Sequence, residues 1–525
     1  MDLSFTDPTM GKKEKSKKGK GAEKTAAKTA KKAEMKHKKE LSEKGEEDVE
    51  KLIENFLLMD RQKERVAEDL VGPPSQRSGC SFLASPDKDL LYLFGGSYFN
   101  GHKTTMYNEL YTYNIKKNNW LRLTTPYAPP PRCSQQSVIV AQGGGQIWMF
   151  GGEFASPTQS QFYHYKDLWC YHIKETRWEK VDAKGGPSAR SGHRMVTNGK
   201  DIFLFGGFHE SLRNAMYYND VYRFSIGDRQ WTKIEPANQG PSPRSGVQMV
   251  MLESNKLMVY GGYSREKLGK DAEKGITYMD MWFLQEGSKT GNIGKWKWSL
   301  VKQGGCQPGP RSGMAAVSGP QPNRAYFFGG VCDREEDEET ITSVCLADLY
   351  MLETDRGLWR EMNLKKEIPK NTGQSIKSAT ESFQTELEEQ QQHDEVKTDG
   401  IFTVRISSGA AVGAASCGDL KPDKDEIQDD RFWPQPRMSS CLAIKHGVLY
   451  LYGGIFETGD QQLVLRDMYA IDIYKMDDWK KIIELNEKEL EWFDSDSEES
   501  EDDIDAEECN DEKGGANDEE DVGHN

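Results

Sequence analysis

The sequence predicts an all-β fold, a six-bladed β-propeller with a short N-terminal helix and disordered charged tails. One pattern of about fifty residues recurs six times, and no helical periodicity runs through any copy. Each copy contains, in order, an arginine, an apolar run that ends in Gly-Gly, an acidic residue and a tryptophan. A repeat of this length indicates one array of stacked units, each of which needs its neighbours to bury a core.

The arginine and the Gly-Gly pair keep a nearly constant spacing, 16 to 19 residues, in all six copies. The arginines are Arg77, Arg132, Arg190, Arg244, Arg311 and Arg437. The glycine pairs begin at Gly95, Gly151, Gly206, Gly261, Gly329 and Gly453. The run before each pair is apolar on both alternating sets of positions, as expected for a strand that is covered on both faces. The glycines indicate a turn that a Cβ would oppose.

An acidic residue begins the next predicted strand, and a tryptophan follows it after 11 or 12 residues in five copies. The pairs are Glu109 and Trp120, Asp167 and Trp178, Asp220 and Trp231, Asp348 and Trp359, and Asp467 and Trp479. In the fourth copy a polar insert, 287–294, separates Asp280 from Trp296 and Trp298. Tryptophan offers a large rigid surface, so we expect it to seal one sheet against the next.

The order Arg-Ser-Gly, apolar-Gly-Gly, Asp-Leu-Tyr and Trp resembles the kelch repeat. The resemblance covers residues 72–363, which hold repeats 1 to 5, and residues 432–484, which hold repeat 6. It implies a β-propeller, a fold that serves binding in many kelch proteins and catalysis at the hub in some kelch-like rings. A segment at 476–493 resembles a domain of unknown function found in related proteins.

Four further segments lie outside the repeats. We expect residues 1–45 to be a basic disordered arm and residues 494–525 to be an acidic disordered tail. Residues 46–70 carry an apolar stripe at helical spacing, which predicts an amphipathic helix packed on the outer face of the first or last blade; a partner-binding helix is the alternative. Residues 364–431 are predicted to be a mostly disordered loop with one short strand at 401–406.

The charge distribution suggests different roles for the two ends. The net charge is −16, yet residues 11–40 hold thirteen lysines and residues 494–521 hold sixteen acidic residues. A lysine-rich arm is typical of segments that bind nucleic acid or an import receptor, although a solubilising tail has the same composition. Without aromatics, any RNA contact through residues 11–40 would be non-specific. We expect no membrane span and no secretion signal, and a location in the nucleus and cytoplasm.

Catalytic and metal motifs are missing from the sequence. The nine cysteines form no CxxC, the histidines form no paired metal spacing, and no nucleophile elbow or phosphate loop occurs. We therefore predict no enzyme activity, no cofactor and no metal, with a catalytic centre at the hub as the alternative. The thiols are expected to be reduced.

The topology of a four-stranded blade predicts a partner site on one face of the ring. The loop into the first strand and the loop after the second strand emerge on the same side, so their residues should surround one mouth. In peptide-binding kelch propellers these positions contact the ligand, and the resemblance carries this role to matching residues here. The predicted contacts are Arg77, Ser78, Arg132, Cys133, Arg190, Ser191, Arg244, Ser245, Arg311, Ser312, Arg437 and Met438 from the first set, and Tyr98, Phe154, His209, Ser264, Cys332 and Phe456 from the second.

Six arginines beside aromatics favour an acidic peptide that bears an aromatic residue, unless the arginines only brace turns. The predicted function is a non-catalytic scaffold or adaptor that binds a protein or peptide, most simply as a monomer. The alternatives are an RNA- or ribosome-assembly factor acting through the basic arm and a substrate receptor of a ubiquitin ligase. No BTB domain or cullin-adaptor box is visible in support of the latter.

Overall fold

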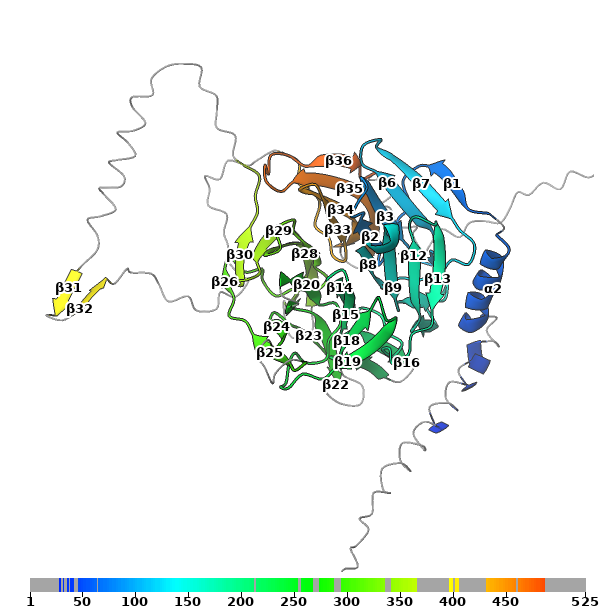
Figure 1. Cartoon of the computed structure of the whole chain (residues 1–525), viewed down its shortest axis with the longest axis horizontal. Helices are drawn as coiled ribbons and strands as arrows, with labels where there is room; N and C mark the ends of the chain where they lie inside the picture. The colour runs from blue at the N-terminus through cyan, green and yellow to red at the C-terminus, as the bar shows by residue number, and fades with distance from the viewer. Residues whose placement is uncertain are drawn as a thin grey trace, which may run out of the picture.

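A computed structural model describes the chain over residues 28–29, 32, 35–36, 38–41, 46–63, 65–211, 214–253, 256–267, 273–287, 294–335, 341–365, 396–399, 402–405, 431–458 and 461–486. Six twisted antiparallel sheets surround a central opening (Figure 1). The expected six-bladed propeller is confirmed. The innermost strands of neighbouring blades contact one another all the way round the ring.

Each blade has four strands, and chain order runs from the innermost strand to the outermost. Blade 1 consists of β2 (Ser81–Ala84), β3 (Leu90–Phe94), β6 (Leu110–Asn114) and β7 (Asn119–Thr124). Blade 2 consists of β8 (Gln136–Val140), β9 (Gln146–Phe150), β12 (Leu168–His172) and β13 (Arg177–Val181). The short 3-10 helix η1 (Gln142–Gly144) lies between β8 and β9. Blade 3 consists of β14 (Arg194–Thr197), β15 (Asp201–Phe205), β18 (Val221–Ser225) and β19 (Gln230–Ile234). Blade 4 consists of β20 (Gln248–Leu252), β21 (Lys256–Tyr260), β24 (Met281–Glu286) and β25 (Trp296–Leu300).

Blades 5 and 6 have longer middle strands. They consist of β27 (Ala315–Ser318), β28 (Arg324–Glu335), β29 (Ile341–Glu353) and β30 (Leu358–Glu361), and of β33 (Cys441–Lys445), β34 (Val448–Thr458), β35 (Gln461–Asp472) and β36 (Lys480–Ile483). Two edge strands extend the ring: β1 (Ala67–Val71) pairs with β7, and β26 (Gly304–Gly305) pairs with β30.

Hydrophobic cores lie between blades. Six clusters of buried residues each combine side chains from two adjacent blades, including blades 6 and 1. The repeated tryptophan packs on the aromatic residue that precedes the Gly-Gly of the previous blade, as Trp178 does on Phe94 with ring centroids 5.1 Å apart. In the fourth blade Trp298 takes this place against Phe205. The tryptophans therefore seal the joints, as predicted.

Backbone hydrogen bonds reinforce four of the six joints. At the joint of blades 1 and 2, the Gly96 amide donates to the Arg132 carbonyl (2.8 Å), the Arg132 amide to the Tyr107 carbonyl (3.1 Å), and the Ser134 amide to the Gly79 carbonyl (2.8 Å). The equivalent three bonds occur at joints 2–3, 3–4 and 5–6. Among the described residues they are absent at joints 4–5 and 6–1. Blades 1 to 4 and blades 5 and 6 thus form two hydrogen-bonded groups that meet at two weaker joints.

The helix before the ring is shorter than predicted. Helix α2 (Val49–Arg61) is capped by the Asp48 carboxylate, which accepts from the Glu50 amide, whereas Ala67–Val71 forms β1 instead of continuing the helix to residue 70. Residues 67–71 form a strand instead of extending the helix because all five pair with β7, the outermost of the four strands of blade 1.

The docking site of α2 also differs from the prediction. Val49 and Ile53 pack on Phe154 and Tyr165 of blade 2 rather than on the outside of the first or last blade. The Gln161 side chain fixes this contact, accepting from the Val49 amide (3.3 Å) and donating to the Glu47 carbonyl (2.8 Å).

The remaining segments are described in part. Within 364–431, β31 (Val396–Asp399) and β32 (Phe402–Arg405) form a two-stranded sheet that joins no other described strand, and β32 corresponds to the strand expected at 401–406. Residues 476–486 belong to blade 6, where Trp479 is buried and β36 forms the edge. Most of the predicted basic arm, and the predicted acidic tail at 494–525, lie outside the described residues.

The pairing of β31 and β32 with each other alone predicts that the insert is dispensable for the ring. Replacing residues 370–428 by a short flexible linker should leave the thermal unfolding transition within a few degrees of the wild type and equally cooperative. Calorimetry would test this, and a broad transition at much lower temperature would show that the segment supports a blade.

Candidate functional site: the hairpin face

One face of the ring carries a hairpin from every blade, which we name the hairpin face. Four are separate two-stranded sheets: β4 (Ser97–Phe99) with β5 (Thr104–Met106), β10 (Glu153–Ala155) with β11 (Phe162–His164), β16 (Phe208–Ser211) with β17 (Asn214–Tyr217), and β22 (Tyr263–Lys267) with β23 (Glu273–Thr277). In blades 5 and 6 the hairpin continues the two middle strands past a bulge at the Gly-Gly pair.

The two predicted sets of contact residues do meet on this face. The residue after each repeated arginine forms an isolated β-bridge with the start of the hairpin in its own blade. The six bridges are Ser78 to Ser97, Cys133 to Glu153, Ser191 to Phe208, Ser245 to Tyr263, Ser312 to Val331 and Met438 to Ile455. The backbone topology inferred from the sequence therefore brings both loops together.

The arginines, however, are structural. Arg77, Arg132, Arg190, Arg244, Arg311 and Arg437 expose at most 9% of their surface. Each Nε donates to a carbonyl two residues earlier at 3.0–3.2 Å. Each Nη1 donates to the first glycine carbonyl at 2.9–3.4 Å and to the acidic residue of its repeat at 2.5–3.1 Å.

This geometry corrects the assignment of the arginines as ligand contacts. A guanidinium that is buried and neutralised by its own carboxylate cannot pair with an incoming acid unless the internal bond breaks. Although burial raises the pKa of Asp167, the charge and hydrogen bonds of Arg132 hold it below its ordinary value. The reason for expecting an acidic ligand therefore disappears.

We call the hydrogen bonds of each repeated arginine its brace, and in blades 1 to 4 a tyrosine ring packs against that arginine. The guanidinium carbon lies 3.6–4.0 Å from the ring centroid of Tyr107, Tyr165, Tyr218 or Tyr278, each of which follows a hairpin. In blades 5 and 6 the guanidinium carbon lies farther from a ring centroid, 5.7 Å from that of Tyr350 and 5.6 Å from that of Tyr469. The two groups of blades thus differ in their turns as well as in their joints.

The other predicted contact residues divide into buried and accessible positions. Phe154 is buried beneath α2, where its ring centroid lies 6.0 Å from that of Phe56, so its assignment as a contact is corrected too. Cys133, Ser191, Ser264 and Cys332 are also buried. The half-buried members are Ser78, Ser245, Ser312, Met438, Tyr98, His209 and Phe456. The accessible part of the face is therefore smaller than the sequence suggested.

A buried polar cluster between blades 2 and 3 was not found from the sequence. The Glu153 carboxylate accepts from the Ser191 hydroxyl (2.8 Å) and lies 3.6 Å from Nδ1 of His164. Nε2 of His164 accepts from the Glu210 amide at 3.1 Å, which keeps this nitrogen unprotonated. Burial, followed by the nearby His209, lowers the pKa of His164 to about 4, and burial raises the pKa of Glu153. These residues come together only where blades 2 and 3 meet, so no local sequence motif predicts the cluster.

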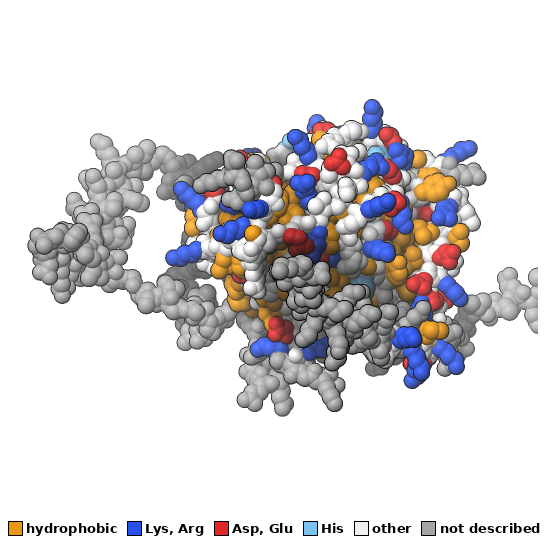
Figure 2. Space-filling model, turned by 60° about the horizontal axis from the view of Figure 1, so that its bottom comes forward, with side chains coloured by type: hydrophobic (Ala, Val, Ile, Leu, Met, Phe, Trp, Pro, Cys, Tyr) orange, Lys and Arg blue, Asp and Glu red, His pale blue; other side chains and the backbone are white. Residues whose placement is uncertain are grey.

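Exposed apolar side chains form a second feature that the repeat pattern does not reveal. Phe162 on β11 and Met216 on β17 are 47% and 56% exposed, on the hairpins of neighbouring blades. They lie at positions that vary between repeats. Charged side chains of both signs are interspersed over the view in Figure 2, with apolar groups between them.

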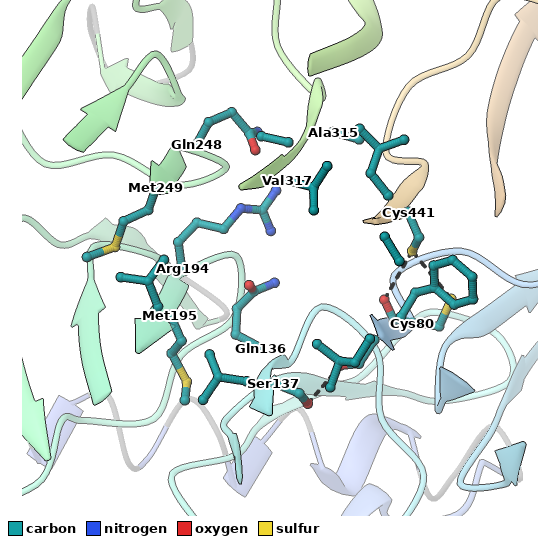
Figure 3. A pocket seen from close by; sticks show the side chains of 18 of the residues that line it. Cys80, Gln136, Ser137, Arg194, Met195, Gln248, Met249, Ala315, Val317 and Cys441 are labelled. Atoms are coloured by element: carbon teal, nitrogen blue, oxygen red, sulfur yellow. Dashed lines mark hydrogen bonds between the residues drawn. The ribbon is translucent and has the colours of Figure 1, made fainter. Parts of the chain in front are cut away.

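A central channel lies among the innermost strands of the ring. Its volume is about 570 Å³, and innermost strands of all six blades line it. Arg194 extends into it, with Gln136 and Gln248 nearby (Figure 3). Within the described residues, no three His, Cys, Asp or Glu side chains come together in a group that could hold a metal ion. Nor does any described helix have the length and apolar character needed to cross a membrane.

The braced Gly-Gly turns, the sealing tryptophans and the six radial sheets define a kelch-type β-propeller. The model of the KLHDC2/KLHL20/DRC7 Kelch-repeats domain matches residues 55–207 and 208–382, more than half of the chain. The chain therefore belongs to this kelch-repeat family.

Three known proteins illustrate the similarity. Host cell factor homolog hcf-1 of Caenorhabditis elegans is 28% identical over 297 residues, which cover 51% of this chain and 33% of that protein. Host cell factor of Drosophila melanogaster is 25% identical over 304 residues, 53% of this chain and 18% of that protein. The N-(sulfonatooxy)prop-2-enimidothioate sulfolyase of Thlaspi arvense is 22% identical over 307 residues, 57% of this chain and 83% of that protein. The chain thus spans a third or less of the two host cell factors.

The brace predicts unequal losses of stability for two matched variants. Arg437 and Asp467 are both fully buried, so Asp467→Asn should lower the free energy of unfolding by about 3–5 kcal/mol. Glu109 is 34% exposed, so Glu109→Gln should cost about 1 kcal/mol or less. Urea unfolding of both variants measures the difference, and equal losses would argue against burial as the source of the effect.

The cluster at His164 predicts a pH-dependent stability. Because its pKa is about 4 in the folded state and about 6.5 in an unfolded chain, the unfolded chain binds the extra proton between these values. Stability should be fully present above pH 6.5 or so and should fall towards pH 4, with His164 contributing on the order of 3 kcal/mol.

His164→Gln, which can still accept from the Glu210 amide, should flatten the plot of unfolding free energy against pH. His102→Gln is the matched control, because His102 is exposed in a hairpin loop. A wild-type slope in His164→Gln would contradict this assignment.

Proposed function

We propose that the protein is a non-catalytic interaction module that docks a protein partner on its hairpin face. The observation that carries the proposal is the exposure of Phe162 and Met216 on neighbouring hairpins that stand outside the blade cores. Aromatic and Met side chains are enriched in protein interfaces, where they supply contact area around which polar groups form a rim.

The rigidity of the ring supports this reading. Each hairpin is attached to a Gly-Gly turn held by a buried guanidinium, so the six hairpins keep fixed relative positions without a ligand. A preorganised surface loses little conformational entropy on binding. Seven predicted contact residues are half-buried on the same face, where a partner can reach them: Ser78, Ser245, Ser312, Met438, Tyr98, His209 and Phe456.

Catalysis is the competing class. Kelch propellers typically serve binding, but one relative, 22% identical, is named a sulfolyase. The polar groups of the hairpin face favour binding: the Glu153 carboxylate accepts from Ser191 within its own cluster, and the arginines are neutralised internally. The Ser191 hydroxyl, which donates to the Glu153 carboxylate, is fully buried, so a substrate on this face does not reach it.

The finer assignments belong to the same proposal. Residues 11–32 and 150–169 resemble kelch domain-containing protein 4, beside which we place the chain within the family. The thirteen lysines of residues 11–40 support nuclear as well as cytoplasmic location and a weak contact with RNA. A role in substrate capture for a ubiquitin ligase is compatible with the docking surface. No oligomeric contact is needed for any of these activities.

A matched pair of double variants tests the docking surface. Phe162→Glu with Met216→Glu places two carboxylates on the hairpin face, whereas Leu300→Glu with Tyr474→Glu changes two equally exposed apolar residues, 64% and 51%, elsewhere on the ring. Proteins retained by the wild type in affinity capture should be lost, by tenfold or more, only with the first variant. Equal retention by both variants would place the partner site elsewhere.

The basic arm is tested by its removal. A fluorescent fusion that starts at Glu46 should shift from the nucleus to the cytoplasm, because it lacks all thirteen lysines of residues 11–40 but keeps α2. A fusion in which residues 494–525 are removed instead serves as the control. An unchanged distribution of the Glu46 fusion would reduce the arm to a solubility feature.

A further inference from the structure

The joint between the last blade and the first differs from the other joints. The chain does not pass directly from one blade to the next across it: blade 1 is built from residues before 125 and blade 6 from residues after 430. The three backbone hydrogen bonds that reinforce four of the joints are absent here among the described residues. A Cβ built on Gly453 would lie 3.4 Å from the Arg77 carbonyl oxygen, against 2.3–2.8 Å for the equivalent contact at the four reinforced joints.

Side chains hold this joint instead of backbone. On the face opposite the hairpins, Lys445 donates to the Ser85 carbonyl (2.6 Å), and His446 contacts Asp89 (2.6 Å). Inside the joint, the buried hydroxyl groups of Tyr452 and Ser440 have no hydrogen-bond partner. An added bond at this joint would therefore link two blades that the repeated backbone hydrogen bonds do not link among the described residues.

Two thiols face each other at this joint. Cys80 precedes β2 of blade 1, Cys441 begins β33 of blade 6, and their sulfur atoms are 3.7 Å apart although 361 residues separate them. Cys441 also donates to the Cys80 carbonyl at 3.4 Å (Figure 3). Both residues line the central channel, whose volume of about 570 Å³ admits a small oxidant.

We propose that Cys80 and Cys441 are a redox modification site, at which a hydroperoxide forms a disulfide that covalently closes the ring. The proposal is independent of the partner that binds the hairpin face. It does not require oxidising conditions at rest, because the pair is a dithiol in this structure.

Cys80 is the better nucleophile of the two. The hydrogen bond from Cys441, together with the charge of Arg77, lowers the pKa of the Cys80 thiol in spite of burial, whereas the pKa of Cys441 is raised well above its ordinary value. The thiolate of Cys80 attacks the peroxide, so an S–O bond forms, the O–O bond breaks and hydroxide leaves.

The second step closes the bond. The Cys441 sulfur attacks the sulfur of the Cys80 sulfenic acid, so the S–S bond forms, the S–O bond breaks and a second hydroxide leaves. The protons released by the Cys80 and Cys441 thiols convert the two hydroxides to water. In sum, two thiols and one hydrogen peroxide give one disulfide and two waters. The sulfurs must approach from 3.7 Å to about 2.05 Å, a movement that no backbone hydrogen bond between described residues of blades 6 and 1 opposes.

The disulfide should make the ring open more slowly. It joins residues 361 apart, and cross-links over long loops restrict the unfolded chain most. Opening at the joint of blades 6 and 1 would no longer separate the two groups of blades. We expect the unfolding rate of the oxidised protein in urea to be about one tenth of the original rate or lower. The reducing agent dithiothreitol should restore the original rate.

The experiment uses the full chain with Cys417→Ser and Cys509→Ser, which removes the two cysteines outside the described residues. After treatment with hydrogen peroxide, peptide mapping by mass spectrometry should find a peptide that links Cys80 to Cys441. The matched control is Cys306→Ser, which removes an exposed thiol and should leave the linked peptide and the slower unfolding intact.

Two outcomes would overturn the proposal. One is oxidation of Cys306 without any Cys80–Cys441 peptide, which depends on no variant of the pair. The other is a linked peptide without slower unfolding, which would deny the cross-link a role in closing the ring. Cys441→Ser should abolish both effects, and its circular dichroism spectrum shows whether it has folded.

Discussion

The fold depends on one interaction repeated six times, a buried guanidinium that joins three parts of its blade. Each arginine holds the segment before the innermost strand, the first carbonyl of the Gly-Gly turn and the acidic residue that starts the third strand. The glycines are required there because a Cβ on Gly151 would lie 2.6 Å from the Arg190 carbonyl oxygen of the next blade. Because each arginine is buried, it cannot contact a ligand. Its hydrogen bonds fix the base of the hairpin, and in this way they determine the shape of the hairpin face.

The six copies are not equivalent, and their differences fall into a pattern. Blades 1 to 4 stack a tyrosine on the arginine and carry separate hairpins, whereas blades 5 and 6 lack the close stack and extend their middle strands. The repeated backbone hydrogen bonds link blades within each group but, among the described residues, not between the groups. The ring is thus two arcs held together by hydrophobic cores and side-chain contacts, and the thiol pair lies where the arcs meet around the chain ends.

Regular features of the sequence predicted the fold well, because the Gly-Gly turns, the acidic residues and the tryptophans each satisfy a constraint local to one repeat. Topology alone also placed Ser78 beside the hairpin that contains Tyr98. The roles of the arginines could not be settled this way, since an exposed and a buried arginine give the same pattern. Phe162, Met216 and the cluster around Glu153 escaped notice because they occupy positions that vary between repeats or that only inter-blade contacts bring together. The helix was predicted too long because β1 takes its structure from pairing with Trp120 and its neighbours rather than from its own sequence.

Hydrogen–deuterium exchange on Asp220→Asn tests the central claim most directly, because it reports on single amides around one brace while the other five stay intact. If the buried pair of Arg190 and Asp220 holds the turn, the Gly207, Ser191 and Phe208 amides should exchange at least tenfold faster than in the wild type, since their backbone partners surround that guanidinium. The matching amides of blade 6 should be unchanged. Equal exchange rates of the Gly207, Ser191 and Phe208 amides in the variant and in the wild type would contradict the account, because the hairpin face would then be ordered by something other than the arginine braces.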